Sequence, residues 1–551
     1  MKDAYFRLVV AIFLMGLLLS SCKISDEVAF RRIFVLKELV NSATPAAERT
    51  EIWAESGPMI IRASESMFPD VRATAISLIN GLLPDRKILM PIVMKAMKDK
   101  DADVRNAAAF TLFNIGKDAR PAIPLMFEAL KDEDPRVQGR AAETLAIFGR
   151  EAIEAEPVLI DLLNDEVPYV RQRAAGALAR IDPSKTTAEH IMELLHDDDR
   201  DTRTEAAQCL GIIGDNAVDA IPMLIDMLND DDDINGPNAA MGLCWYPKIP
   251  REYAPALIKA LDEFKYRYVR EYLVYAVASI GPEPEVIEAL IRDLNNGSDT
   301  AAYFLGNMGP RPGILEALAY VTKKPNISAL CREQAARSMG RLGLDAKTVL
   351  PYLVEALNSD SPLIWAGAAD GLAALKPDPA PVIGRLKDIA GLGANKIIIP
   401  KGWQPDVSYT KSGGYYYEEV AQISAAYAIA KLSPADKKDA MHILINGLNH
   451  ACCGIRAKAI ERLAKFGPEP EIIAALIKTL DDEDENNKRS AAVILGDMGP
   501  AAIEALPKLQ DLADDYFTRM YHNVTGADNY RDAAREAIEK ITGEPYKLDY
   551  N

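Results

Sequence analysis

The chain has 551 residues, of which 49% are hydrophobic, 26% are charged and only 7% are aromatic. These proportions exclude wholesale disorder and favour closely packed helices over a sheet sandwich. The formal net charge of −18 argues against nucleic acid or an anionic lipid surface as a general ligand.

Residues 1–21 are typical of an export signal. Lys2 and Arg7 frame a positive start, and the apolar run over residues 8–19 is shorter than the roughly 20 residues that a bilayer span needs. The run ends in Leu-Ser-Ser-Cys, which resembles the bacterial lipobox, where the cysteine becomes N-terminal and lipid-modified. The resemblance implies that Cys22 anchors the protein to a membrane of the bacterial cell envelope, exposed to the periplasm or the exterior. A plain signal peptide or membrane anchor with an incidental cysteine is the alternative, and the sequence leaves open which membrane is involved.

A repeated pattern covers the chain from about residue 58. Each unit has an apolar residue, usually a basic one, then an Ala-Ala pair, then a leucine or isoleucine and often a glycine. A proline and an apolar stripe at helical spacing mark a second helix upstream. A single helix pair cannot bury both of its faces, so the pairs must stack. We therefore predict an all-α fold, a right-handed α-solenoid of about 14 helix pairs, whose units are aligned on Ala75, Ala108, Ala141, Ala174, Ala206, Ala239, Leu273, Ala301, Ala335, Ala368, Ala425, Ala459, Ala491 and Ala534.

These units resemble HEAT repeats, in particular the short HEAT-like type also found in phycobilisome lyases. In that family an aspartate in the turn between the two helices and an arginine six positions later bond successive repeats. In this chain Arg270, Arg332 and Arg456 lack that aspartate. The resemblance implies a structural ladder made by Asp99 and Arg105, Asp165 and Arg171, and Asp197 and Arg203.

We divide the chain into the signal peptide 1–21, a lipidated N-terminus with capping helices 22–57, repeats 58–390, an inserted loop 391–417, and C-terminal repeats with a cap 418–551. The loop separates two units by 57 residues instead of 32 to 34. Its aromatic side chains are of the type enriched at binding hot spots. It either binds a partner or is an insertion packed on neighbouring helices or left loose. The partner-binding candidates in it are Trp403, Tyr409, Tyr415, Tyr416 and Tyr417.

A second candidate surface is the aromatic segment over residues 266–275. Tyr272 belongs to it, with Arg267 and Arg270 beside it. We expect some of these side chains to project from the second helix of their repeat toward the concave face, while others pack within the repeat.

The sequence contains no recognisable catalytic motif. Its five histidines form no zinc-binding pattern, and none is followed by glutamate as in HEAT-like di-iron hydroxylases. His450, Cys452 and Cys453 lie close together and suggest either a metal or redox site or, more simply, a turn and a helix start. No cofactor or metal is predicted.

The function that these features favour is a non-catalytic scaffold for protein–protein interaction. We expect a protein partner along the concave face or the inserted loop, contact with membrane through the lipid anchor only, and no nucleic acid. One alternative is a carbohydrate- or envelope-polymer-binding lipoprotein that uses Trp403 and the tyrosines of the loop. A lyase-type or metal-dependent enzyme is a further alternative.

Overall fold

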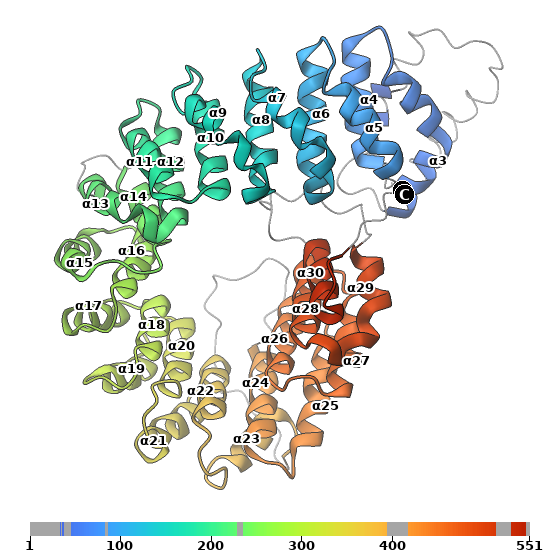
Figure 1. Ribbon diagram of the computed structural model, residues 1–551. Helices are drawn as coiled ribbons and strands as arrows, with labels where there is room; N and C mark the ends of the chain where they lie inside the picture. The colour runs from blue at the N-terminus through green and yellow to red at the C-terminus, as the bar shows by residue number, and fades with distance from the viewer. Residues whose placement is uncertain are drawn as a thin grey trace. The chain divides into compact units, whose positions relative to one another are not determined.

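The computed structural model describes residues 33–34, 36–37, 46–82, 86–228, 235–393, 417–513 and 530–546. Within these ranges all regular structure is helical and no strand is present. The helices follow one another as fourteen pairs, from α3/α4 to α29/α30 (Figure 1). The prediction of an all-α solenoid of stacked helix pairs is therefore confirmed.

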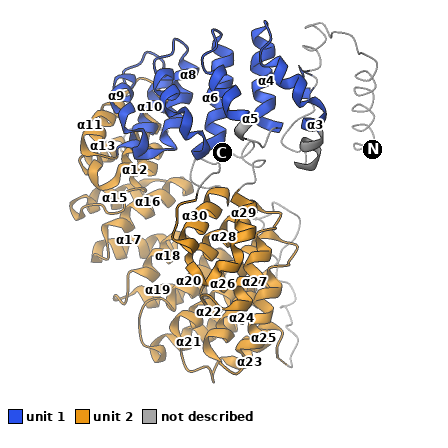
Figure 2. Cartoon of the chain, turned by 45° about the vertical axis from the view of Figure 1, so that its right-hand side comes forward, with its two compact units in different colours: residues 1–182, 515–526, 548–551 blue, residues 183–514, 527–547 orange. Residues whose placement is uncertain are grey.

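The chain forms two compact units (Figure 2). Unit 1 comprises residues 1–182, 515–526 and 548–551, and unit 2 comprises residues 183–514 and 527–547. The helices of unit 1 are α3 Ala46–Ala63, α4 Pro69–Leu82, α5 Arg86–Ala96, α6 Ala102–Ile115, α7 Ile123–Ala129, α8 Pro135–Ala146, α9 Glu156–Leu162 and α10 Pro168–Ile181.

Unit 2 continues the same alternation. Its helices are α11 Lys185–Glu193, α12 Arg200–Ile213, α13 Ile221–Leu228, α14 Asn235–Leu243, α15 Ala254–Glu263, α16 Arg267–Ile280, α17 Pro284–Asn295, α18 Asp299–Asn307, α19 Ile314–Thr322, α20 Ala329–Met339, α21 Ala346–Leu357, α22 Pro362–Leu375, α23 Ile383–Ala390, α24 Tyr417–Leu432, α25 Lys437–Gly447, α26 Cys453–Ala464, α27 Pro470–Thr479, α28 Glu485–Asp497, α29 Leu506–Ala513 and α30 Tyr530–Thr542.

Local sequence sets where these helices begin and end. Asp101 and Asp134 cap α6 and α8, and each side chain accepts a backbone N–H of the first turn. Pro135 occupies the first helical position of α8, where its missing N–H has no intrahelical partner. Gly116 ends α6 with a φ of 70°, a conformation that costs glycine little.

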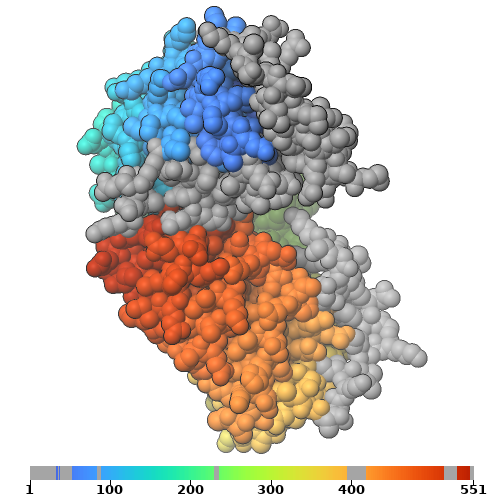
Figure 3. Space-filling model, turned by 90° about the vertical axis from the view of Figure 1, so that its right-hand side faces the viewer, coloured from blue at the N-terminus to red at the C-terminus, as the bar shows by residue number. Residues whose placement is uncertain are grey.

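Within unit 2 the odd-numbered helices form one layer and the even-numbered helices form the other (Figure 1). The even-numbered helices pack directly on one another, for example α20 on α22 and α22 on α24. Alanines from the Ala-Ala pairs, such as Ala335, Ala368 and Ala425, are fully buried in this layer. Figure 3 shows that the atoms of the described residues beyond 417, coloured orange to red, form one continuous surface.

Arginines at the start of the even-numbered helices connect successive repeats. The Arg105 Nη1 donates to the Asp99 carbonyl oxygen at 2.9 Å, and its Nε and Nη2 bind the Asp132 carboxylate of the next turn at 2.6 and 2.7 Å. Arg72 binds Asp99 in the same bidentate manner. In these pairs the arginine uses a backbone carbonyl of its own turn and the aspartate of the following turn.

This geometry explains why the ladder tolerates repeats without the aspartate. Arg456 donates to the carbonyl oxygen of His450 at 2.8 Å and binds Asp482 at 2.7 Å. Any residue supplies the carbonyl, so an aspartate in an arginine's own turn is not required for that contact. Arg171 and Arg203 likewise donate to the carbonyl oxygens of Asp165 and Asp197, each at 2.8 Å.

Candidate binding surface on the even-numbered helices of unit 2

One column of side chains changes character along the even-numbered helices of unit 2. Its members lie two residues after the aligned small residue of each repeat, so they occupy equivalent positions on their helices. The column passes from aromatic to charged and back to aromatic through Tyr275 on α16, Tyr303 on α18, Arg337 on α20, Asp370 on α22 and Tyr427 on α24.

The aromatic end of the column forms a patch of three rings. Tyr275 and Phe304 meet edge to face with centroids 5.0 Å apart, and Phe304 meets Tyr303 in the same way at 5.4 Å. The Arg341 guanidinium lies 6.0 Å from the Tyr303 ring centroid. Tyr275 and Tyr303 are 47% and 44% exposed, so these rings hold one another in place while keeping area open to a ligand. We call Tyr275, Tyr303 and Phe304 the aromatic patch.

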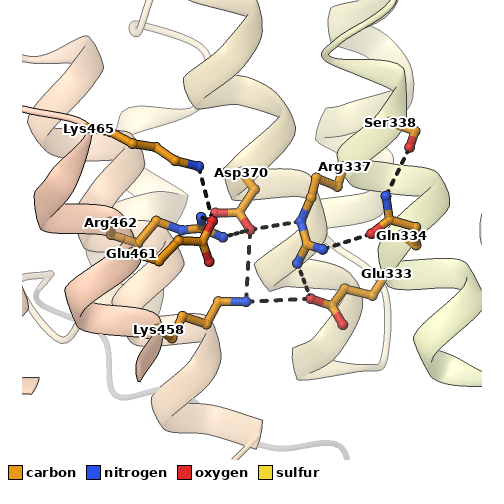
Figure 4. A network of polar contacts seen from close by, with 9 residues as sticks. All are labelled: Glu333, Gln334, Arg337, Ser338, Asp370, Lys458, Glu461, Arg462 and Lys465. Carbon is orange, nitrogen blue, oxygen red and sulfur yellow. Dashed lines mark hydrogen bonds and ion pairs between the residues drawn. The ribbon is translucent and has the colours of Figure 1, made fainter. Parts of the chain in front are cut away.

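The charged part of the column is a buried ion-pair network (Figure 4). Asp370 accepts from Arg337 Nε at 3.0 Å and from Arg462 Nη2 at 2.5 Å, and Lys458 Nζ lies 4.0 Å away. Arg337 also pairs with Glu333 on the same helix. The network thus joins α20, α22 and α26, and Asp370 and Arg462 are separated by 92 residues of sequence.

Burial makes this network energetically important. The side chains of Asp370 and Arg462 are only 5% and 3% exposed. Burial by itself raises the pKa of Asp370, but the positive charges of Arg462, Lys458 and Arg337 outweigh it and hold the pKa below its ordinary value. Asp370 is therefore ionised at neutral pH, and its charge balances cations that have little access to water.

Glycines bring the helices of the network close together. A Cβ added at Gly367 on α22 would lie 2.1 Å from the carbonyl oxygen of Glu333 on α20. One added at Gly340 would lie 2.0 Å from the carbonyl oxygen of Gly371. No side chain fits at these contacts, so α20 and α22 touch backbone to backbone, which places Arg337 within reach of Asp370.

Beyond the network, lysines surround two packed rings. The Tyr427 and Phe466 centroids are 5.7 Å apart. Lys431 Nζ lies 4.2 Å from the Phe466 centroid, and Lys437 and Lys465 each lie 5.8 Å from one of the two rings. We use the name lysine cluster for Lys376, Lys431, Lys437 and Lys465.

The structure places the predicted residues of α16 in different surroundings. Arg267 is exposed and pairs with Glu271 at 3.1 Å and with Asp299 at 3.5 Å. Arg270 is a member of the ladder, since it binds Asp293 and donates to the Phe264 carbonyl oxygen at 3.1 Å. Tyr272 is half-buried. Partner binding by these three residues stays a prediction.

The inserted loop lies mostly outside the described residues. Gly391 follows α23, and Tyr417 is the first residue of α24 and is half-buried. The other aromatic candidates of the loop, Trp403, Tyr409, Tyr415 and Tyr416, fall in the range 394–416 that the structure does not describe.

The His450 region forms a turn and a helix start. His450 Nδ1 accepts the backbone N–H of Cys452 at 3.0 Å, and Cys452 is the residue before α26. His442 and His450 also line a cleft of about 770 Å³ between α25 and α27. Within the described ranges no group of three or more His, Cys, Asp or Glu side chains is arranged to hold a metal ion.

Sequence reasoning missed both the buried network and the lysine cluster. Asp370 stands in an otherwise apolar helix, where a lone charge signals a buried partner. Its partner Arg462 could not be found, because 92 residues separate the two in the sequence, including the inserted loop and one complete repeat, α23 and α24. Among the described helices none combines the length and the apolar composition that crossing a membrane requires.

Comparisons with known proteins support the repeat assignment. A model described as HEAT repeats matches residues 156–235 and 441–520, and a model described as HEAT repeat matches residues 89–119. The Kap95:Nup1 complex contains a chain that is 16% identical, with a TM-score of 0.51, and the match covers 95% of this chain and 77% of that one. Yeast importin-beta (Kap95p) gives 15% identity and a TM-score of 0.51 at the same coverage. At these identities the likeness shows the fold alone. No curated protein matches the sequence.

Proposed function

We propose that this protein is a non-catalytic scaffold that binds a protein partner on the even-numbered helices of unit 2. The observation that carries the proposal is the aromatic patch, whose tyrosines are about half exposed on a tightly packed helix layer. Rigid aromatic side chains contribute large contact area at low cost in conformational entropy, and they dominate binding hot spots. The importin-beta fold supports the same reading, since Kap95 is seen in complex with Nup1.

The buried network supports this location because it stabilises the helices next to the patch. Arg337 and Asp370 occupy the same column as Tyr275 and Tyr303, and they connect α20 and α22 by a direct ion pair. A platform that does not deform loses less free energy when a partner binds.

Replacing both Tyr275 and Tyr303 by alanine is expected to weaken partner binding by about tenfold or more, because hot-spot truncations cost about 1–2 kcal/mol each. The partner is first captured from solubilised membranes and identified, and the purified partner is then titrated against wild type and variant by calorimetry. Tyr320→Ala is the matched control, since Tyr320 is 52% exposed but lies on the odd-numbered helix α19. Equal affinity of the double variant and the wild type would contradict the proposed surface.

We further propose that the scaffold is tethered to a bacterial cell-envelope membrane by a lipid on Cys22. Support comes from the sequence: two basic residues, a short apolar run and a cysteine at the position that the lipobox requires. Two or more acyl chains provide stable anchoring, whereas a single chain gives marginal binding.

Cys22→Ala is expected to abolish incorporation of a labelled fatty acid and to release the protein from the membrane fraction. Cys453→Ala serves as the control, because Cys453 is an exposed free thiol and its loss leaves the lipobox intact. Persistent labelling of the Cys22 variant would show that the anchor lies elsewhere.

A further inference from the structure

A concentration of positive charge interrupts the acidic surface of unit 2. The chain carries a net charge of −18, yet lysines gather where three successive even-numbered helices end. Lys376 directly follows α22, Lys431 lies in the last turn of α24, and Lys465 directly follows α26.

The cluster is built around apolar rings. Lys431 Nζ packs on Phe466 and donates to the Lys465 carbonyl oxygen at 2.6 Å. Burial lowers the pKa of Lys431, and the neighbouring charges of Lys376, Lys437 and Lys465 lower it further. The positive field here therefore exceeds the compensation from Glu469. A negative group that approached the cluster would relieve this repulsion.

Lys376 has an unusual backbone conformation. Its φ is 51°. In the described part of the chain it is the one residue with a positive φ that is not a glycine. The equivalent position, eight residues after the aligned small residue, is a glycine with positive φ in eight other repeats: Gly116, Gly149, Gly214, Gly281, Gly309, Gly343, Gly467 and Gly499. A side chain in this region costs conformational energy that glycine avoids.

The position of a lysine at a helix C-terminus accounts for the presence of Lys431, but it does not account for Lys376. Carbonyl groups at a helix C-terminus attract cations, and Lys431 uses one of them. Within the described residues the ammonium group of Lys376 makes no hydrogen bond or ion pair. Backbone strain of this kind gathers at binding sites, and the exposed side chain of Lys376 is available to a ligand.

We propose that the lysine cluster binds an extended acidic segment of the protein partner, with Lys376, Lys431 and Lys465 each meeting a carboxylate. This inference rests on the proposed function and specifies the chemistry of the partner. Neighbouring helices of a layer lie about 8–10 Å apart. An extended chain in the polyproline II conformation advances about 3.1 Å per residue and returns every third side chain to the same face. Carboxylates about three residues apart therefore match successive repeats.

The surroundings favour a peptide over a dense polyanion. Glu469 pairs with Lys437 at 2.8 Å, and Glu461 pairs with Lys465 at 3.1 Å. These carboxylates repel a ligand that carries a charge at every unit, as does the net charge of the chain. A peptide with spaced carboxylates and apolar residues between them avoids that repulsion and also contacts Phe466, which is half-buried.

The test uses the full chain and a fluorescent peptide of about twelve residues with glutamate at about every third position, compared with its glutamine counterpart. The glutamate peptide is expected to bind more tightly, and Lys376→Gly is expected to weaken it about three- to fivefold. Lys376→Gly should fold with equal or higher thermal stability, because glycine relieves the positive φ. Lys259→Gln, which removes an exposed lysine on α15, is the control and should bind as wild type.

Equal binding of the two peptides, or unchanged binding by Lys376→Gly, would overturn the proposal. Tighter binding of sulfated dextran with the same dependence on Lys376 would also overturn it, in favour of a polymer ligand. The tyrosine variants separate this failure from failure of the proposed function. Loss of partner affinity on removal of Tyr275 and Tyr303 would still support protein binding on the same helix layer.

Discussion

Replacing Asp370 by asparagine is expected to destabilise unit 2 by about 3–5 kcal/mol, the cost of leaving buried charges unpaired. Arg337, Lys458 and Arg462 face Asp370 and Glu333 in the network, and Arg462 also pairs with the more exposed Glu461. Loss of Asp370 leaves the buried Arg337 and Lys458 with Glu333 as their shared carboxylate, and leaves Arg462 with Glu461. The change is read from urea denaturation and from hydrogen exchange of peptides in α20, α22 and α26.

Asp262→Asn is the matched control for this variant. Asp262 pairs with Arg292 at 3.0 Å, but both side chains are about half exposed. An exposed pair contributes less than about 1 kcal/mol. Similar losses of stability from the two substitutions would show that the buried network contributes no more to stability than an exposed ion pair.

The same variant changes the response to acid. Because the folded pKa of Asp370 lies below its unfolded value, its ionised form contributes stability above the unfolded pKa of about 3.9. That contribution is lost as the pH falls through the folded pKa. Wild type is therefore expected to lose stability below about pH 4 more steeply than Asp370→Asn, and parallel curves would contradict the assignment.

Gly367→Ala is expected to destabilise unit 2 by about 1–3 kcal/mol or more, the usual cost of overpacking. The new methyl group would lie 2.1 Å from the Glu333 carbonyl oxygen, so α20 and α22 must move apart. That movement also separates Arg337 from Asp370. The unfolding midpoint in urea and the exchange of α22 measure the effect.

Gly384→Ala provides a control in the opposite direction. Gly384 lies within α23, and no atom lies within 4 Å of a Cβ built on it. Alanine there should stabilise the chain by about 0.5–1 kcal/mol through helix propensity alone. An equal gain in stability from Gly367→Ala and Gly384→Ala would contradict the close backbone contact between α20 and α22.

The fold was predictable because each repeat has the same pattern of buried small and apolar residues, and the pattern recurs many times along the chain. Ala108-Ala109, Ala141-Ala142 and Ala174-Ala175 are all buried where two helices approach closely. The apolar positions around them have the spacing of a helix buried on one side. A departure from the pattern in one repeat does not hide the period, because the neighbouring repeats keep it.

The candidate site was less predictable because it depends on departures from the rule. Lys376 could have been found in the sequence, since it replaces a glycine that recurs at the ends of other repeats. The pairing of Asp370 with Arg462 could not, because their proximity depends on how tightly α22, α24 and α26 stack. The sequence pattern marks the aromatic residues of the inserted loop and of the segment 266–275, which contains Tyr275. Tyr303 and Phe304 lie within an ordinary repeat, and no sequence feature marks them.

Hydrogen exchange of the full chain, with and without its purified partner, tests the central claim most directly. Protein binding on the even-numbered helices of unit 2 predicts protection of peptides from α16 and α18, and from the helix ends that carry Lys376, Lys431 and Lys465. Protection confined to the odd-numbered helices, or no protection at saturating partner, would contradict the account.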